Sequence, residues 1–196
     1  MYLHENNKEL FKDLISITSE RMHIREEIIE KDYYVTMILR LLANISDKIV
    51  FKGGTSLSKA FEIIDRFSED VDITFTEHIG DSRRKRLKYE ILKPIEEKLK
   101  MDIKNWAYIE SNKNYNHYDY YYNSVLDNSI GGLPPYIKLE TALMSYSFPT
   151  EEKFISNYIY KVFAVDEPDI MNQKIFIRMT ILIPHKILFL IVLVMK

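Results

Sequence analysis

Two adjacent glycines followed by two closely spaced aspartates constrain this chain more than any other feature. The stretch "VFKGGTSLSKAFEIIDRFSEDVDITF", residues 50–75, contains Gly53 and Gly54, two of only five glycines in 196 residues. A short apolar run precedes the pair, and polar and apolar residues alternate from Asp70 to Phe75. We therefore expect a strand that ends at the glycines, then a helix, then a half-buried strand.

The glycine pair between a strand and a helix is suited to phosphate binding. Glycine lets the backbone approach an anion closely, and free N–H groups at a helix start point towards it. The alternative is a tight turn with a structural role only. The stretch "GGTSLSK" lacks the spacing of a P-loop, and no GxGxxG dinucleotide motif is present.

Asp70 and Asp72 are separated by one residue, so in a strand both carboxylates lie on the same side. Two carboxylates this close repel each other and raise one pKa unless a cation offsets the repulsion. Such oxygen ligands suit Mg²⁺, which commonly takes one or two protein carboxylates together with substrate phosphates. The alternative is an exposed strand side with ordinary solvated acids.

The segment after the glycines has a helical period. Thr55 or Ser56 could cap this helix, and its expected buried residues fall at i, i+3, i+4 and i+7: Leu57, Ala60, Phe61 and Ile64.

The rest of the chain combines helical and extended patterns. Pro94 is expected to kink or split one helix. The predicted helices lie within residues 1–45 and 81–99, and the predicted strands at 103–111, 117–125, 136–143 and 157–165. The strands at 103–111 and 117–125 are expected to form a hairpin. The class is therefore α+β, with a mixed sheet flanked by helices and an N-terminal helical segment.

Composition indicates a folded protein of about one domain. The hydrophobic content is 46%. The net charge of −2 does not indicate a general affinity for nucleic acid. The absence of cysteine excludes disulfides, thiolate nucleophiles and cysteine zinc sites. The polar N-terminus lacks the apolar core of a signal peptide, so a cytoplasmic location is expected.

The C-terminal segment from Ile175 to Lys196 is unusually apolar. Its longest unbroken apolar run, Ile187 to Met195, is too short to span a bilayer, and no membrane association is expected. Three interpretations stay open: a buried strand or helix, a truncated or frameshifted end, and a membrane anchor.

Several of these motifs together resemble a known family. Gly53-Gly54 followed by Asp70-Val71-Asp72-Ile73 is similar to the signature of polymerase-beta-type nucleotidyltransferases. More narrowly, "EKDYYVTMILRLL" (30–42), "FKGGTSLSKAF" and "RFSEDVDI" resemble the AbiEii/AbiGii nucleotidyltransferase toxins. The resemblance covers roughly residues 25–165. It implies a nucleotidyltransferase domain over 1–170 and an atypical apolar tail over 171–196.

The resemblance also implies roles for individual residues. Asp70 and Asp72 would hold Mg²⁺, with Glu140 of "YIKLETAL" as a third carboxylate; Glu140 could equally be a solvated strand acid. Nucleotide binding would fall to the glycine turn and its helix: Gly53, Gly54, Thr55, Ser56 and Lys59. Lys59 would reach a phosphate from the first turn of the helix, the alternative being a solvated polar side. Lys138 could share the cleft with Glu140.

The implied reaction transfers a nucleoside monophosphate from an NTP, with GTP associated with the family, to an acceptor such as tRNA or another RNA. The protein would be the toxin of a type IV toxin–antitoxin or abortive phage infection system, with an antitoxin encoded nearby. The C-terminus departs from the family pattern. The rival hypothesis is therefore a catalytically inactive remnant that keeps the fold as a nucleotide-binding or interaction module.

Two further features have alternative explanations. The basic run "RRKRLK", 83–88, could steer RNA or be a solvated helix side. The tyrosine cluster could stack on bases or belong to the sheet core: Tyr118, Tyr120, Tyr121 and Tyr122.

Overall fold

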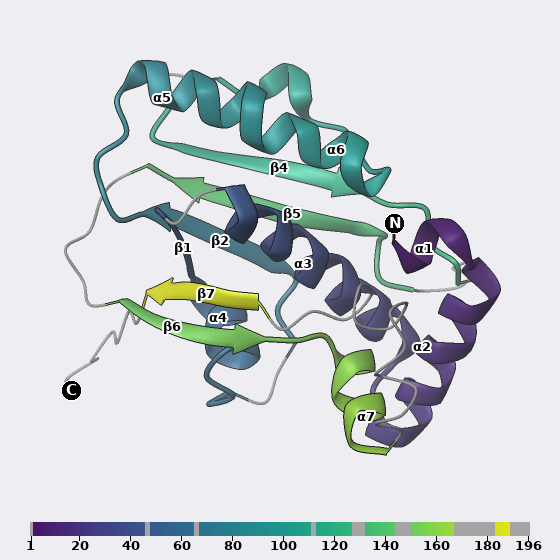
Figure 1. Ribbon diagram of the computed structural model, residues 1–196. Coiled ribbons are helices and arrows are strands. Elements are labelled where there is room, and N and C mark those ends of the chain that lie inside the picture. Colours follow the sequence, from purple (N-terminus) through teal and green to yellow (C-terminus); the bar gives the residue numbers. More distant parts are fainter. Residues whose placement is uncertain are drawn as a thin grey trace.

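The computed structural model contains one seven-stranded mixed sheet with helices packed against it (Figure 1). It describes residues 2–45, 48–64, 67–110, 113–126, 132–143, 150–166 and 183–188. The helices are α1 (Leu3–Asn6), α2 (Lys8–Met22), α3 (Glu26–Ile45), α4 (Gly53–Lys59), α5 (Asp81–Arg86), the π-helical η1 (Leu87–Leu92), α6 (Lys93–Leu99), the 3₁₀ turn η2 (Trp106–Tyr108) and α7 (Tyr158–Asp166). The strands are β1 (Ile49–Lys52), β2 (Asp70–Phe75), β3 (Asp102–Ile103), β4 (Tyr115–Tyr121), β5 (Tyr136–Ala142), β6 (Thr150–Ile155) and β7 (Ile183–Leu188).

The strand order in the sheet is β3-β4-β5-β2-β1-β7-β6. The central strands β2 and β5 run parallel, whereas β1 pairs antiparallel with β2. On the other side, β1 runs parallel to β7. The expected α+β class with a mixed sheet is therefore confirmed, as are the strands predicted at 70–75 and 136–143.

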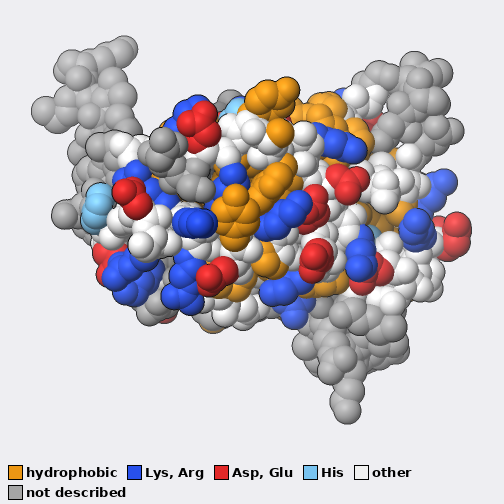
Figure 2. Space-filling model, turned by 90° about the horizontal axis from the view of Figure 1, so that it is seen from above, with side chains coloured by type: hydrophobic (Ala, Val, Ile, Leu, Met, Phe, Trp, Pro, Cys, Tyr) orange, Lys and Arg blue, Asp and Glu red, His pale blue; other side chains and the backbone are white. Residues whose placement is uncertain are grey.

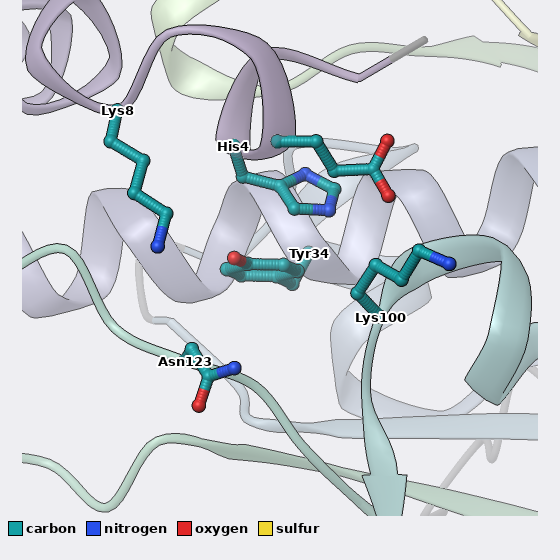
Figure 3. A pocket seen from close by; sticks show the side chains of 6 residues that line it. His4, Lys8, Tyr34, Lys100 and Asn123 are labelled. Carbon is teal, nitrogen blue, oxygen red and sulfur yellow. The ribbon is translucent and has the colours of Figure 1, made fainter.

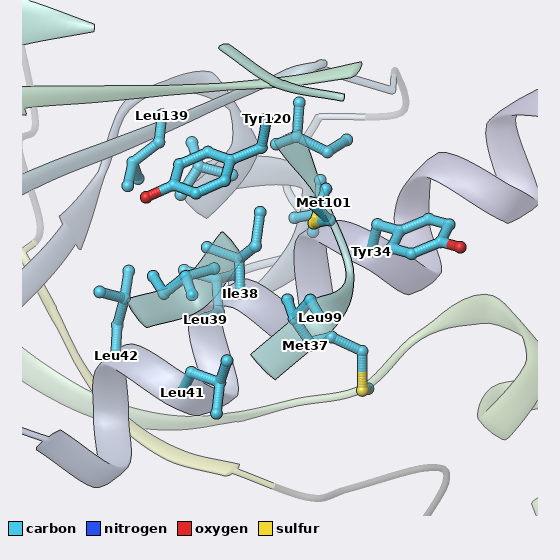
Figure 4. Close-up of a cluster of buried hydrophobic side chains, with 14 of the residues drawn as sticks. Tyr34, Met37, Ile38, Leu39, Leu41, Leu42, Leu99, Met101, Tyr120 and Leu139 are labelled. Atoms are coloured by element: carbon cyan, nitrogen blue, oxygen red, sulfur yellow. The ribbon is translucent and has the colours of Figure 1, made fainter. Parts of the chain in front are cut away.

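Helix α3 forms the centre of the core. Its residues from Ile29 to Leu39 are all buried, so the helix has no solvated side over this length. It crosses the front of the sheet in Figure 1, and its apolar side chains gather with Leu99 of α6 and with Tyr120 and Leu139 of the sheet (Figure 4). A helix that is buried on all sides is typical of such a central position.

The N-terminal helices confirm the helical prediction for residues 1–45. Helix α1 is docked through His4, whose Nδ1 lies 3.0 Å from the Tyr33 hydroxyl and whose Nε2 lies 3.1 Å from the Leu99 carbonyl oxygen. Burial lowers the pKa of His4, while Glu5 and the Leu99 carbonyl act in the opposite direction. The imidazole is therefore held in its neutral form, linking α1 to α3 and to the end of α6.

The strand expected at 157–165 is wrong, because this segment is the helix α7. Asn157 caps it: its side-chain oxygen accepts a hydrogen bond from the Tyr160 N–H at 2.7 Å, and its carbonyl accepts one from Lys161. The buried residues Ile159, Val162 and Phe163 follow at helical spacing. The aromatic and β-branched composition favoured a strand, but the cap and the spacing decided the structure.

The hairpin expected from 103–111 and 117–125 is correct only in part. Strand β3 covers two residues and pairs antiparallel with β4, while Trp106–Tyr108 form a 3₁₀ turn. Strand β4 begins at Tyr115, inside the expected turn, and ends at Tyr121. The helical segment 81–99 exists as α5, η1 and α6, with Gly80 at the N-cap of α5 and Pro94 in the first turn of α6.

The segment 171–196, set apart in the sequence, contributes β7 to the sheet. Its six residues, Ile183–Leu188, pair with β1 on one side and with β6 on the other. Of the interpretations left open for this segment, a strand applies to these residues. In the part of the chain that the structure describes, no helix combines the length and the apolar character needed to cross a bilayer.

Candidate functional site

The turn between β1 and α4 depends on Gly53. Gly53 has φ +76°, a conformation that residues with a side chain rarely adopt. A Cβ at this position would lie 2.8 Å from Cγ of Asp72 and closer still to its Oδ2. Glycine is required here because the Asp72 carboxylate lies directly against the backbone.

Helix α4 begins at Gly53 with Lys52 at the N-cap, so the glycines belong to its first turn and neither Thr55 nor Ser56 is the cap. The helix ends at Lys59, too early for the expected apolar side to form. Its buried residues are instead polar: Thr55, Ser56 and Lys59. The residues that were expected to be buried are only partly so: Leu57, Ala60, Phe61 and Ile64.

The hydroxyls of α4 are used to hold the turn in place. Thr55 Oγ1 donates a hydrogen bond to the carbonyl oxygen of Asp70, and Ser56 Oγ donates one to that of Gly53 at 2.8 Å. The first of these bonds joins α4 directly to the start of β2. Thr55 and Ser56 therefore contact the backbone on both sides of the candidate site.

Lys59 lies away from the position that the sequence suggested for it. Its ammonium group is buried and donates to Oδ1 of Asp32 in α3. Burial lowers the pKa of Lys59, and the neighbouring Asp32 carboxylate acts in the opposite direction. The expected phosphate contact would require this buried ion pair to break.

Three carboxylates share one side of the sheet, which we call the polar face. Asp72 lies opposite Glu140 in the parallel pairing of β2 with β5, and Asp70 lies opposite Lys138. Their strand neighbours Val71 and Leu139 are fully buried on the other side, against the helices. Register and the alternation of side chains thus bring Asp70, Asp72 and Glu140 to one place.

The pKa values of the two aspartates are raised. Burial raises the pKa of Asp72 to about 6, Lys52 opposes this, and the negative charges of Glu140 and Asp70 add to it. Burial also raises the pKa of Asp70, with Lys138 opposing and Glu140 adding to the shift. Burial is the main cause of both shifts, and the crowding of the carboxylates adds to it.

Glu140 is the hydrogen-bonding centre of the group. Burial would raise its pKa, but hydrogen bonds from Tyr115, Lys138 and Asp72 outweigh burial and lower it. The Lys138 ammonium lies 3.2 Å from Glu140 Oε1. The opposite shifts show that, of this coupled pair, Asp72 takes up a proton more readily than Glu140.

Strand β4 brings further residues to the polar face that sequence reasoning missed. His117 lies opposite Glu140, and Asp119 lies opposite Lys138. Tyr115, two residues before His117, lies on the same side, and its hydroxyl is bonded to Glu140. Period-two spacing from Tyr115 to Asp119 was visible in the sequence, but only the register with β5 shows which side faces Glu140.

The candidate ligands have side chains of a type that binds metal ions, but these side chains do not converge on one point. Among the described residues, no three His, Cys, Asp or Glu side chains converge closely enough to form a ready metal site. Asp72 and Glu140 are in direct hydrogen-bond contact, and the charge of Glu140 acts on Asp70. Carboxylate oxygens of this kind suit a hard divalent cation.

Two cavities lie elsewhere in the molecule. One cavity of about 350 Å³ is lined by His4, Glu5, Lys8, Tyr34, Lys100 and Asn123 (Figure 3). A second, of about 370 Å³, lies beside α5 and the far end of β2. Neither is lined by a residue expected in the site.

The basic run at 83–88 does not form a continuous basic surface. Arg83 bonds to Glu77, Arg84 to the Ile79 carbonyl and Arg86 to Glu90. The face seen from above, on the side of α5 and α6, accordingly shows cations interspersed with acids (Figure 2). Of the tyrosine cluster, Tyr118, Tyr120 and Tyr122 are buried in the core, as the structural alternative expected.

In this α+β fold Asp72 lies against the glycine turn, as the resemblance to nucleotidyltransferases implies. The chain belongs to the AbiEii family: the family model described as "Nucleotidyl transferase AbiEii toxin, Type IV TA system" matches residues 38–179, well over half of its length. Family membership therefore agrees with the resemblance found in the sequence.

Among solved structures, the chain is similar to MenT4, a nucleotidyltransferase toxin from Mycobacterium tuberculosis. The identity is 19% and the TM-score 0.44, over 71% of this chain and 47% of the MenT4 chain. This chain thus spans about half the length of that toxin. No curated protein matches significantly.

Proposed function

We propose that this protein is a nucleotidyltransferase that transfers a nucleoside monophosphate from an NTP to an acceptor hydroxyl. The observation that carries the proposal is the position of Asp72, which lies against Gly53 on one side and next to Glu140 of the neighbouring strand on the other. A metal-binding carboxylate and a phosphate-binding turn are thereby adjacent. Family membership supports the same reaction class.

Each group of residues has a distinct role in this proposal. Asp70, Asp72 and Glu140 would hold Mg²⁺, which supplies charge neutralisation for the phosphates when bound. The backbone amides of Gly53 and Gly54 would donate to the terminal phosphates, while Thr55 attaches that turn to β2 and Ser56 bonds to Gly53 within it. The acceptor hydroxyl forms the new bond to the α-phosphorus as the bond to the β-phosphate oxygen breaks, and pyrophosphate leaves.

One residue of β4 and one of β5 would support the carboxylates. Tyr115 and Lys138 both hydrogen-bond Glu140, which fixes the direction in which its oxygens point. Second partners of this kind commonly orient metal ligands. Lys138 also offsets the negative charge of Glu140 until a cation binds.

The biological role follows from the family description. We propose that the protein is the toxin of a type IV toxin–antitoxin pair that acts in the cytoplasm in abortive phage infection, with a cognate antitoxin. RNA, with tRNA first among candidates, would be the acceptor, and GTP is the first nucleotide to try.

Incubation with Mg²⁺, each labelled NTP and total RNA tests the proposal. The wild-type protein should transfer label and should bind less labelled nucleotide without Mg²⁺, whereas the Asp70→Asn/Asp72→Asn variant should not transfer label. Transfer that is equal in both proteins would refute the assigned site. Nucleotide binding without transfer by the wild type would favour the rival hypothesis of an inactive binding module.

A further inference from the structure

Three consecutive charged residues are buried in the middle of α3. Glu30 is 1% exposed, Lys31 0% and Asp32 3%, in a helix that is otherwise apolar over this length. Neighbouring helix residues point about 100° apart, so the three side chains leave α3 in different directions. Charges in such surroundings need partners, and each of these three has a partner in a different segment.

Glu30 forms hydrogen bonds with the segment that follows β4. Its Oε2 accepts a hydrogen bond from Ser124 Oγ at 2.6 Å, and its Oε1 accepts one from the Val125 N–H at 2.8 Å. Both partners follow the last residue of β4, Tyr121, by a few positions. The strand that carries Tyr115 and His117 is thereby anchored to α3 at its far end.

Lys31 holds the start of β2. Its ammonium group donates to Oε2 of Glu69, the residue directly before Asp70. The same ammonium group lies 5.4 Å from the centre of the Tyr136 ring, at the first residue of β5. One buried cation thus contacts both strands that carry the candidate metal ligands, close to the point where they begin.

Asp32 holds α4. Its Oδ1 accepts from Lys59 at the end of α4, and its Oδ2 accepts from the Tyr158 N–H at the start of α7 at 2.7 Å. The Lys59 ammonium also lies 5.7 Å from the Tyr158 ring centre. Because Thr55 of the same short helix is bonded to Asp70, Asp32 is linked through α4 to the glycine turn and to β2.

We propose that Glu30, Lys31 and Asp32 act as positioning residues, which together set the distance between the phosphate-binding turn on α4 and the carboxylates on β2 and β5. The inference rests on the proposed function, and it changes the role of Lys59 from a phosphate ligand to a second positioning residue. None of these side chains touches the substrate; each acts through the segment that it holds.

Stability alone does not explain three such residues. Replacing a buried ion pair by well-packed apolar side chains is often neutral or stabilising, so a core of this kind gains little from charge. The charged contacts instead fix the positions of the segments, because each hydrogen bond requires a particular partner in a particular place. All three partners lie on segments next to the candidate site.

Two double variants distinguish positioning of the candidate site from general stabilisation of the fold. Asp32→Asn/Lys59→Met removes the contact to α4, and Lys31→Met/Glu69→Gln removes the contact to β2, while neither leaves a lone buried charge. The exposed pair Arg86→Met/Glu90→Gln on α5 and η1 is the matched control. Each protein is measured by thermal unfolding, by calorimetric binding of Mn²⁺ and of a non-hydrolysable NTP, and by amide hydrogen exchange.

The two variants should lose different properties. In the Asp32/Lys59 variant we expect NTP affinity to fall about tenfold or more, with faster exchange at residues 53–59. In the Lys31/Glu69 variant we expect Mn²⁺ affinity to fall about 10- to 100-fold, with faster exchange at residues 68–72. The control should match the wild type.

Unchanged exchange and unchanged affinities in both folded variants would overturn the inference, as would equal losses of both ligands in both variants. The hydrogen-exchange readout needs no substrate. A wild-type protein that binds neither Mn²⁺ nor NTP would therefore refute the proposed function, while the local exchange pattern would still decide whether the triplet positions these segments.

Discussion

At Gly53, the absence of a side chain lets the Asp72 carboxylate reach the turn after β1. The glycine pair alone indicated a turn, and the two aspartates alone indicated a polar strand side. Their connection is a contact between residues far apart in sequence, which the positive φ of Gly53 makes possible. Gly53 and Asp72 therefore each restrict which residue the other position can hold.

Gly53→Ala should therefore disrupt both the turn and the carboxylate. A side chain at positive φ costs about 1–2 kcal/mol, and the contact with Asp72 adds to this. We expect the free energy of unfolding to fall by about 2 kcal/mol or more, with loss of Mn²⁺ binding. Urea denaturation and calorimetry measure the two effects.

Gly80→Ala is the matched control, since nothing lies within 4 Å of a Cβ at that position. It should leave the binding of Mn²⁺ unchanged. Equal effects of the two substitutions would contradict the requirement for glycine at position 53.

Asp72 should make the metal-free protein less stable as the pH rises. Its folded pKa of about 6 lies above its ordinary value of 3.8, so between these values the folded state holds a proton that the unfolded state releases. The stabilising effect of that proton is complete below about pH 4 and is lost as the pH rises through 6. At pH 7, Asp72→Asn should therefore be more stable than the wild type.

The expected gain is about 1 kcal/mol, because solvent contact reduces the ~3 kcal/mol that such a shift would carry in a fully buried group. Urea denaturation between pH 4 and 7 measures it, with the exposed Asp13→Asn as control. A difference between variant and wild type that does not grow with pH would disprove the assignment.

At the scale of elements, the sequence predicted the strands of the site better than its helices. The same-side placement of Asp70 and Asp72 followed from strand period alone, because β2 is regular, whereas Glu140 was expected from the family resemblance. Helix α4 was misjudged, since a seven-residue helix that ends at Lys59 cannot use apolar residues beyond its end. Its buried polar side depends on partners in α3 and β2 that no local pattern reveals.

The sequence of α7 contains a helical signal, but its strand-like composition outweighed that signal in the prediction. The composition of residues 157–165 favoured a strand, whereas Asn157 and the spacing of Ile159, Val162 and Phe163 favoured a helix. Local propensity is a weak guide when a cap and a buried side agree against it. The register that brings Tyr115 to Glu140 was, by contrast, not encoded locally at all.

Asn157→Ala should remove the N-cap of α7. The Tyr160 N–H would lose its acceptor, and such a loss typically costs about 1 kcal/mol of stability. Denaturant unfolding monitors the change, and the exposed Asn114→Ala provides the comparison. An unfolding free energy equal to that of the wild type would show that the cap contributes nothing.

Helix α1 should loosen on acidification. His4 has a folded pKa below 6.5, so below this pH the unfolded state takes up a proton that the folded state resists. Its contribution to stability is therefore complete above about pH 6.5 and falls as the pH decreases below that value.

In His4→Gln this part of the pH dependence should disappear, although the variant is less stable at every pH because it loses the contacts with Tyr33 and Leu99. Thermal unfolding from pH 5 to 7 measures the slope. The exposed His78→Gln should keep the wild-type slope, and a steep slope in His4→Gln would exclude His4 as its source.

For the molecule as a whole, the sheet order concentrates the proposed site at its centre. Strands β2 and β5 lie in the middle of the seven, β1 leads directly into the glycine turn, and α3 supports all of these segments from the opposite side. The fold class was predictable because it needs only element types. The strand order was not, since β7 is inserted beside β1 from the distant C-terminal segment.

Binding at this centre should stabilise the entire protein. A non-hydrolysable NTP with Mg²⁺ at about 100 times its Kd should add about 2.7 kcal/mol, or roughly 5 to 11 °C in Tm. Differential scanning fluorimetry measures the shift. Asp70→Asn/Asp72→Asn should show no shift with the same ligands, and a shift of wild-type size in that variant would place binding elsewhere.

The parallel pairing of β2 with β5 also has a consequence during protein synthesis. Asp72 and its partner Glu140 are made far apart in time, on the order of seconds at about 5–20 residues per second. Until Glu140 has left the ribosome, the nascent chain carries the glycine turn and two aspartates but not the third carboxylate. The three carboxylates can therefore come together only after the segment that carries Glu140 has emerged from the ribosome.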